Sequence, residues 1–91
     1  MTEPTERLRR LRIRCWRRGT KEMDLLLGPF ADALAEGRAS TDLDALEALI
    51  AENDQELYLW VSGALATPEP HRAAIAALRE FHGIAPSARA R

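Results

Sequence analysis

The sequence contains little cysteine, no long apolar run and no glycine-rich nucleotide motif. Its 91 residues include one cysteine, Cys15, so no internal disulfide can form and a reducing compartment is the expected environment. No apolar run approaches the roughly 20 residues that cross a bilayer, so we expect no membrane insertion. Gly-x-Gly-x-x-Gly and the phosphate-binding loop are both missing. Together with the short length of the chain, these absences exclude a two-domain enzyme with its own nucleotide fold.

The charges of the chain are unevenly distributed. Apolar residues make up 46% of the sequence and charged residues 30%, which is typical of a small protein that folds by itself. The net charge is −1, yet residues 1–22 hold eight basic and three acidic side chains, whereas residues 23–91 hold five and eleven. This division indicates a charged surface that steers a partner. A mitochondrial transit peptide is disfavoured because Glu3 and Glu6 interrupt the basic segment, which contains no serine.

Composition and spacing favour helices. Sixteen alanines and thirteen leucines outnumber the ten Val, Ile and Thr residues, and apolar residues recur at helical spacing in five segments. We therefore expect an all-α fold, a compact bundle of five short helices, with a single domain over residues 1–83 and a flexible tail over 84–91. The positions expected to be buried are Leu8, Leu11, Cys15, Met23, Leu26, Leu27, Phe30, Leu34, Leu43, Leu46, Ile50, Leu57, Trp60, Val61, Ala64, Ala74, Ile75, Leu78 and Phe81.

Capping residues and a proline predict the helix boundaries. The residues expected to cap the five helices are Thr5, Gly19, Ser40 or Thr41, Asp54, and Thr67 followed by Pro68. The second helix contains Gly28 and Pro29 in its interior. Because proline lacks an N–H and its ring clashes with the carbonyl of Leu25, we expect a kink or a short break there.

The usual catalytic and metal-binding groups are scarce, and we expect no catalytic, cofactor-binding or metal-binding residue. His71 and His82 lie eleven residues apart on one predicted helix and lack a third ligand nearby, which favours a structural role. Cys15 falls on the buried side of the first predicted helix. A small apolar packing residue is the more common role for such a cysteine than a nucleophile.

The most informative local segment is Arg18-Gly19-Thr20-Lys21-Glu22. In a structural interpretation, Gly19 caps the second helix, and Glu22 at the third helical position bonds back to the capping N–H. In a functional interpretation, a glycine corner without a side chain displays a guanidinium and a carboxylate to a partner protein. These residues alone leave both interpretations open.

The aromatic residues raise the same question of core against interface. Trp60 lies on the apolar stripe of its predicted helix and is expected in the core. Trp16 and Tyr58 fall off their stripes, so we expect them to be partly exposed near the charged corner. Exposed aromatic side chains beside arginine are typical of protein-binding surfaces.

Two segments resemble a known family in the order and spacing of their residues. The matching positions are Arg18, Gly19, Glu22, Asp24, Leu25, Pro29 and Phe30 in the first segment, and residues 54–60, Asp-Gln-Glu-Leu-Tyr-Leu-Trp, in the second. The first segment contains an Arg-Gly-x-x-Glu signature, and the second is acidic and then aromatic. Over about residues 7–81, the sequence is similar to the SdhE-type flavinylation factors, called succinate dehydrogenase assembly factor 2 in mitochondria.

The resemblance implies a five-helix, chaperone-like accessory factor rather than an enzyme. Such a protein binds the flavoprotein subunit of succinate dehydrogenase, and often of fumarate reductase in bacteria, and promotes covalent attachment of FAD to a histidine of that subunit. FAD would be the client's cofactor and not be bound stably by this chain, which we expect to be a monomer in the bacterial cytoplasm. The partner-binding residues would be Arg18, Gly19 and Glu22, surrounded by Trp16, Arg17, Asp24 and Tyr58. Thr20 departs from the methionine common in the family, so that contact is expected to be weaker or different.

The run of arginines from Arg7 to Arg18 also suggests a small nucleic-acid-binding module, which is the alternative function. The arginines spread over the outer surface of a helix, as on an ordinary solvated face, and the isoelectric point near 6.1 is far below that of a basic nucleic-acid-binding domain. We therefore expect no nucleic-acid partner. An independent small enzyme is disfavoured because no acid–base constellation can be named.

Overall fold

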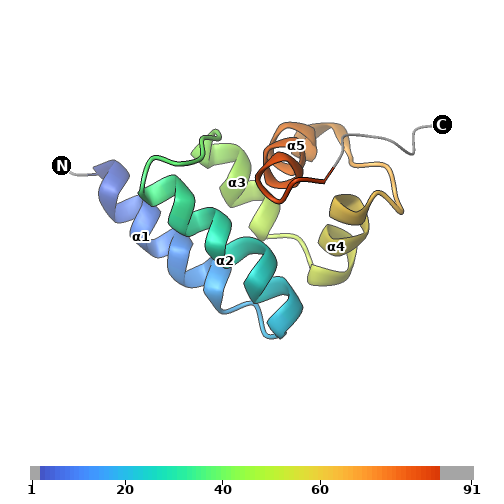
Figure 1. The fold of residues 1–91 in the computed structure, drawn as a ribbon, viewed down its shortest axis with the longest axis horizontal. Coiled ribbons are helices and arrows are strands. Elements are labelled where there is room, and N and C mark those ends of the chain that lie inside the picture. Colours follow the sequence, from blue (N-terminus) through green and yellow to red (C-terminus); the bar gives the residue numbers. More distant parts are fainter. Residues whose placement is uncertain (1–2, 85–91) are drawn as a thin grey trace. The chain divides into compact units, whose positions relative to one another are not determined.

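The structure of the protein is a computed structural model that describes residues 3–84 (Figure 1). Within that range the chain is helical and contains no strand, so the predicted all-α class is confirmed. The elements are α1 (Glu3–Trp16), α2 (Lys21–Ala35), α3 (Leu43–Ile50), α4 (Asp54–Ser62), the short 3-10 helix η1 (Glu69–His71) and α5 (Arg72–Phe81). They form two compact units, which divide between Ser40 and Thr41. The single domain over residues 1–83 stays a prediction, and the predicted tail lies outside the described residues apart from Ile84.

The first unit is a pair of helices, α1 packed along α2 (Figure 1). Leu11 and Cys15 of α1 are buried, as the spacing predicted. Leu27 and Phe30 of α2 are also almost fully buried, and each contributes about 1.5–3 kcal/mol to stability through the apolar surface removed from water. Of the other positions predicted in this unit, Met23 and Leu34 are buried, whereas Leu8 and Leu26 are half-buried.

The predicted start of α1 and the predicted break within α2 are wrong. Thr5 does not cap α1, because the helix already includes Glu3. Of the predicted kink or short break at Pro29, the break is absent, since α2 runs without interruption from Lys21 to Ala35, and the kink stays a prediction. Buried side chains lie on both sides of the proline, so packing against α1 outweighs the local preference for a break.

The second unit contains α3, α4, η1 and α5, and α5 packs against both α3 and α4. The core positions predicted there are buried with three exceptions: Leu43 and Phe81 are half-buried and Ala64 is exposed. Leu49 is fully buried although the stripe did not include it. Trp60 is in the core, as expected, with 5% of its surface exposed.

The caps of the second unit differ from the predicted ones by one or two residues. The carboxylate of Asp42, rather than Ser40 or Thr41, accepts the Asp44 N–H at 3.2 Å. Asn53, rather than Asp54, caps α4 and accepts the Glu56 N–H at 2.9 Å. Several neighbouring residues could serve as caps in each case, and the path of the chain selects one of them.

The last helix begins differently from the prediction. Thr67 does not cap it, because the chain first forms the 3-10 turn Glu69–His71 and becomes α-helical at Arg72. Pro68 precedes the turn in extended conformation. Short 3-10 turns are common at the start of α-helices, and the proline at the second position of this turn loses no hydrogen bond there.

Candidate partner-binding site

The loop of residues 17–20 joins α1 to α2 and carries the predicted corner. Its third residue, Gly19, has a φ of +111°, in the left-handed region that side chains disfavour. A Cβ atom at Gly19 would meet no other atom within 4 Å. The backbone conformation therefore requires glycine at this position, and the surface above it is open to a partner.

Thr20 caps α2, which changes the interpretation of Glu22. The Oγ1 of Thr20 accepts the Met23 N–H at 3.3 Å, so the predicted cap at Gly19 is wrong. Counted from Thr20, Glu22 occupies the second helical position rather than the third, where a carboxylate would bond back to the cap. Glu22 is exposed in the first turn of α2, where the helix dipole favours its charge. The predicted capping role of Glu22 is therefore wrong.

Asp24 holds the loop from within. Its Oδ1 accepts the backbone N–H of Arg18 at 2.7 Å, in a partly buried position. Its own N–H donates to the carbonyl of Thr20 at 2.9 Å, as the first turn of α2 requires. A carboxylate bonded in this way fixes the backbone at the corner. Asp24, one of the predicted surrounding residues, therefore contacts the backbone of the loop and stabilises it.

Arg17 and Arg18 provide the positive side of the corner. Arg17 is exposed, and its N–H donates to the Arg14 carbonyl at 3.4 Å, one turn back at the end of α1. Arg18 is half-buried. Two arginines thus immediately precede the open Gly19 in the chain, and the exposed Glu22 follows it by three residues.

Cys15, one turn before the corner, is a packing residue. Its side chain is fully buried, and burial raises the pKa of its thiol to about 11. The positive charges of Arg18 and Arg14 oppose this shift without overcoming it. Because the thiolate is the reactive form, such a cysteine is inert, as the sequence predicted.

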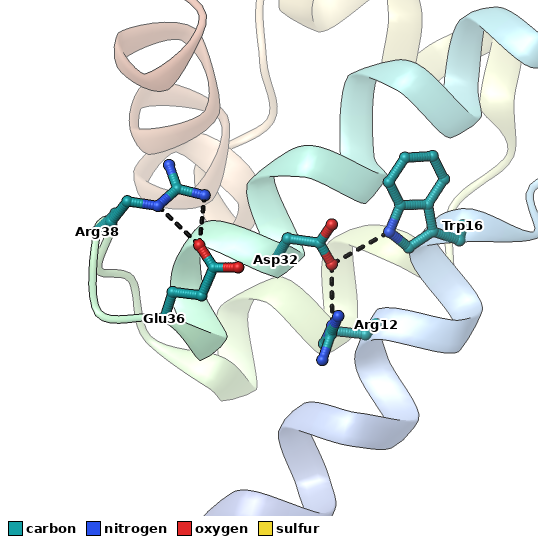
Figure 2. Close-up of polar contacts among 5 residues, drawn as sticks. All are labelled: Arg12, Trp16, Asp32, Glu36 and Arg38. Carbon is teal, nitrogen blue, oxygen red and sulfur yellow. Dashed lines mark hydrogen bonds and ion pairs between the residues drawn. The ribbon is translucent and has the colours of Figure 1, made fainter.

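Trp16 contacts α2 at two points, of which Figure 2 shows the hydrogen bond to Asp32. Its Nε1–H donates to Oδ1 of Asp32 at 3.2 Å, and the same oxygen accepts Nε–H of Arg12 at 2.9 Å. The indole ring also lies against Gly28, where an added Cβ would be 2.3 Å from the ring. Trp16 is partly exposed, as expected, at 38% of its surface.

Sequence reasoning missed Gly28 and Asp32 as parts of this arrangement. Gly28 was interpreted with Pro29 as a helix breaker, although a glycine inside a helix also indicates a close approach by another group. Just after the end of α2, Figure 2 shows a second ion pair, in which Nη2 of Arg38 lies 2.7 Å from Oε1 of Glu36. That pair takes no part in the corner.

Tyr58 belongs to the second unit and lies on α4. It is exposed at 53% of its surface, as predicted. The two units are not placed relative to one another. Its membership of the corner's surroundings therefore stays a prediction.

The histidines flank α5 rather than lying on one helix as predicted. His71 is buried, stacks on Trp60 with ring centroids 5.3 Å apart, and places Nε2 3.0 Å from Oε2 of Glu52. This position gives His71 a structural role. Among residues 3–84, no three His, Cys, Asp or Glu side chains are grouped as metal ligands. None of the helices described in that range is long and apolar enough to cross a membrane.

Residues 3–84 form a small all-α protein whose loop between α1 and α2 carries an open glycine flanked by charged residues. A family model described as "Flavinator of succinate dehydrogenase" matches residues 9–82, and the chain belongs to that family. A protein of Acetobacter pasteurianus named "FAD assembly factor SdhE" is 40% identical over 63 residues, which cover 69% of this chain and 58% of that relative. No solved structure matches the chain. The family resemblance predicted from the sequence is confirmed, together with the expectation of an accessory factor rather than an enzyme.

Proposed function

We propose that this chain binds the flavoprotein subunit of succinate dehydrogenase through Arg18, Gly19 and Glu22 and promotes covalent attachment of FAD to it. The observation that carries the proposal is the exposure of Glu22 beside the open Gly19, while Thr20 supplies the helix cap. Glu22 is thus available to a partner. Membership of the flavinator family supports succinate dehydrogenase as the source of the client.

The corner supports a clamp mechanism. Arg18 and Glu22 would make charge-assisted hydrogen bonds across the interface, and Gly19 would let the two backbones approach closely. The chemistry of FAD attachment would belong to the flavoprotein, whose flavin and histidine are held in a productive orientation by the complex. FAD is then a cofactor of the client and is not bound stably by this chain. Fumarate reductase would be a second client. The chain would act as a monomer in the cytoplasm.

Co-expression with the flavoprotein subunit tests this function. Covalent FAD is measured by in-gel flavin fluorescence after denaturation, with wild type, Arg18→Ala, Glu22→Ala or no partner chain. We expect each variant to lower covalent FAD by about tenfold, the effect of removing one strong interface contact. Glu36→Ala is the matched control, because it removes an exposed carboxylate from the other end of the same helix. Equal covalent FAD with and without the chain would refute the function.

A further inference from the structure

The face of the Trp16 indole lies directly on Gly28. A Cβ atom at Gly28 would lie 2.3 Å from Cδ2 and 2.4 Å from Cε2 of Trp16. These two atoms form the bond shared by the two rings, and Cε3 follows at 2.7 Å. Real Cβ atoms do not approach other atoms so closely, so any side chain at position 28 would displace the ring. Position 28, which Trp16 covers, is therefore occupied by glycine, although glycine is unfavourable inside a helix such as α2.

Asp32 fixes the edge of the same ring. It lies four residues after Gly28 in α2, so both residues are on one face of that helix. Its Oδ1 accepts the indole N–H and the Arg12 Nε–H (Figure 2). The ring is thus held through its face by Gly28 and through its edge by Asp32, and both contacts come from α2.

Trp16 is the last residue of α1, so its position determines where the corner loop begins. The loop is then fixed at Arg18 by Asp24 and at its end by the Thr20 cap. Preorganised loops bind more tightly because less conformational freedom is lost in the complex. We propose that Gly28 and Asp32 are positioning residues, which seat Trp16 and thereby place the Arg18–Gly19 corner for the flavoprotein. This inference rests on the proposed function.

Gly28→Ala tests whether Gly28 positions the indole of Trp16. The chain contains two tryptophans, so a ¹H–¹⁵N spectrum has two indole N–H resonances. We expect the Trp16 resonance to shift and that of Trp60, in the second unit, to remain. Affinity for the purified flavoprotein subunit of succinate dehydrogenase, measured by calorimetry, is expected to fall by about tenfold.

Gly37→Ala is the matched control for stability. It adds the same methyl group to the same unit, at a φ of +79° and with no atom within 4 Å of the new Cβ. The backbone strain should lower the melting temperature while the Trp16 resonance stays in place. Affinity for the flavoprotein should then remain within about twofold of wild type. An equal loss of affinity in this control would overturn the inference, because stability alone would explain it.

A double-mutant cycle separates the seat from other effects of alanine. Trp16→Leu removes the ring, so adding Gly28→Ala to it should lower affinity no further. Asp32→Asn keeps an oxygen that can accept the indole N–H, and it should retain more affinity than Asp32→Ala. Additive losses in the cycle would show that Trp16 and Gly28 act independently, which would contradict a positioning role for Gly28.

The outcomes distinguish this inference from the proposed function. If Gly28→Ala leaves the Trp16 resonance or the affinity unchanged while Arg18→Ala lowers the affinity, the positioning role is refuted and the proposed function stands. If Arg18→Ala and Glu22→Ala both bind the flavoprotein as wild type does, the proposed function fails and the inference fails with it.

Discussion

Asp24→Ala is expected to destabilise the protein and loosen the corner. The change removes a 2.7 Å hydrogen bond between a carboxylate and the Arg18 N–H, in a partly buried position. Bonds to charged groups contribute about 1.5–3 kcal/mol, so we expect the free energy of unfolding to fall by about 2 kcal/mol. For a chain of this size, that loss lowers the melting temperature by roughly 8–16 °C. Urea unfolding followed by far-UV circular dichroism measures the change.

Glu22→Ala provides the comparison, since Glu22 is an acidic residue in the same first turn of α2. Its carboxylate is exposed and interacts mainly with the helix dipole, so its loss should cost only about 0.3–1 kcal/mol. Asp24→Asn keeps an acceptor for the Arg18 N–H and should fall between the two. We expect Glu22→Ala to lower flavinylation with little change in stability, whereas Asp24→Ala lowers both.

Two results would contradict this reasoning. Equal stability of wild type and Asp24→Ala would mean that the carboxylate does not hold the loop. Equal destabilisation by Glu22→Ala and Asp24→Ala would mean that Glu22 caps the helix and is not available to a partner.

Three further changes probe the corner, the thiol and the second unit. Gly19→Ala forces a side chain to a φ of +111° without any clash, so it should lower the melting temperature by several degrees, about 1 kcal/mol in differential scanning calorimetry. The pKa of the Cys15 thiol is 9.0 in the unfolded chain and about 11 in the folded one, so between these pH values the unfolded chain binds fewer protons than the folded chain. The free energy of unfolding should therefore fall as the pH rises through this range. The slope is at most about 1.4 kcal/mol per pH unit and should disappear in Cys15→Ala. Leu57→Ala empties a fully buried position and should cost about 2–5 kcal/mol in urea unfolding.

The sequence predicted the helices and most of their buried faces because these depend on local spacing. Leu11, Phe30 and Leu78 are buried where a 3.6-residue period places them. Interruptions and caps were predicted less well. Pro29 does not break α2, because packing on both sides of it outweighs its local preference.

The same limit applies to the site. The signature identified Gly19 and Glu22 as candidates, but it left open whether Glu22 caps the helix or is displayed to a partner. The roles of Asp24 and Gly28 could not be predicted, because each depends on a contact that only the folded path creates. A carboxylate six residues from the N–H it accepts, and a glycine twelve residues from the indole it seats, lie outside the range of helical periodicity. These contacts require the three-dimensional structure.

Because the thiol of Cys15 is buried, a second cysteine introduced at the corner can be labelled selectively. Cys15 is the single cysteine of the chain and is shielded from reagents at neutral pH. A cysteine placed at an exposed position such as Lys21 would therefore react alone, with no need to remove the native one. Fluorophores or photo-crosslinkers could then be attached around the loop, one position at a time, to record which side chains a client covers.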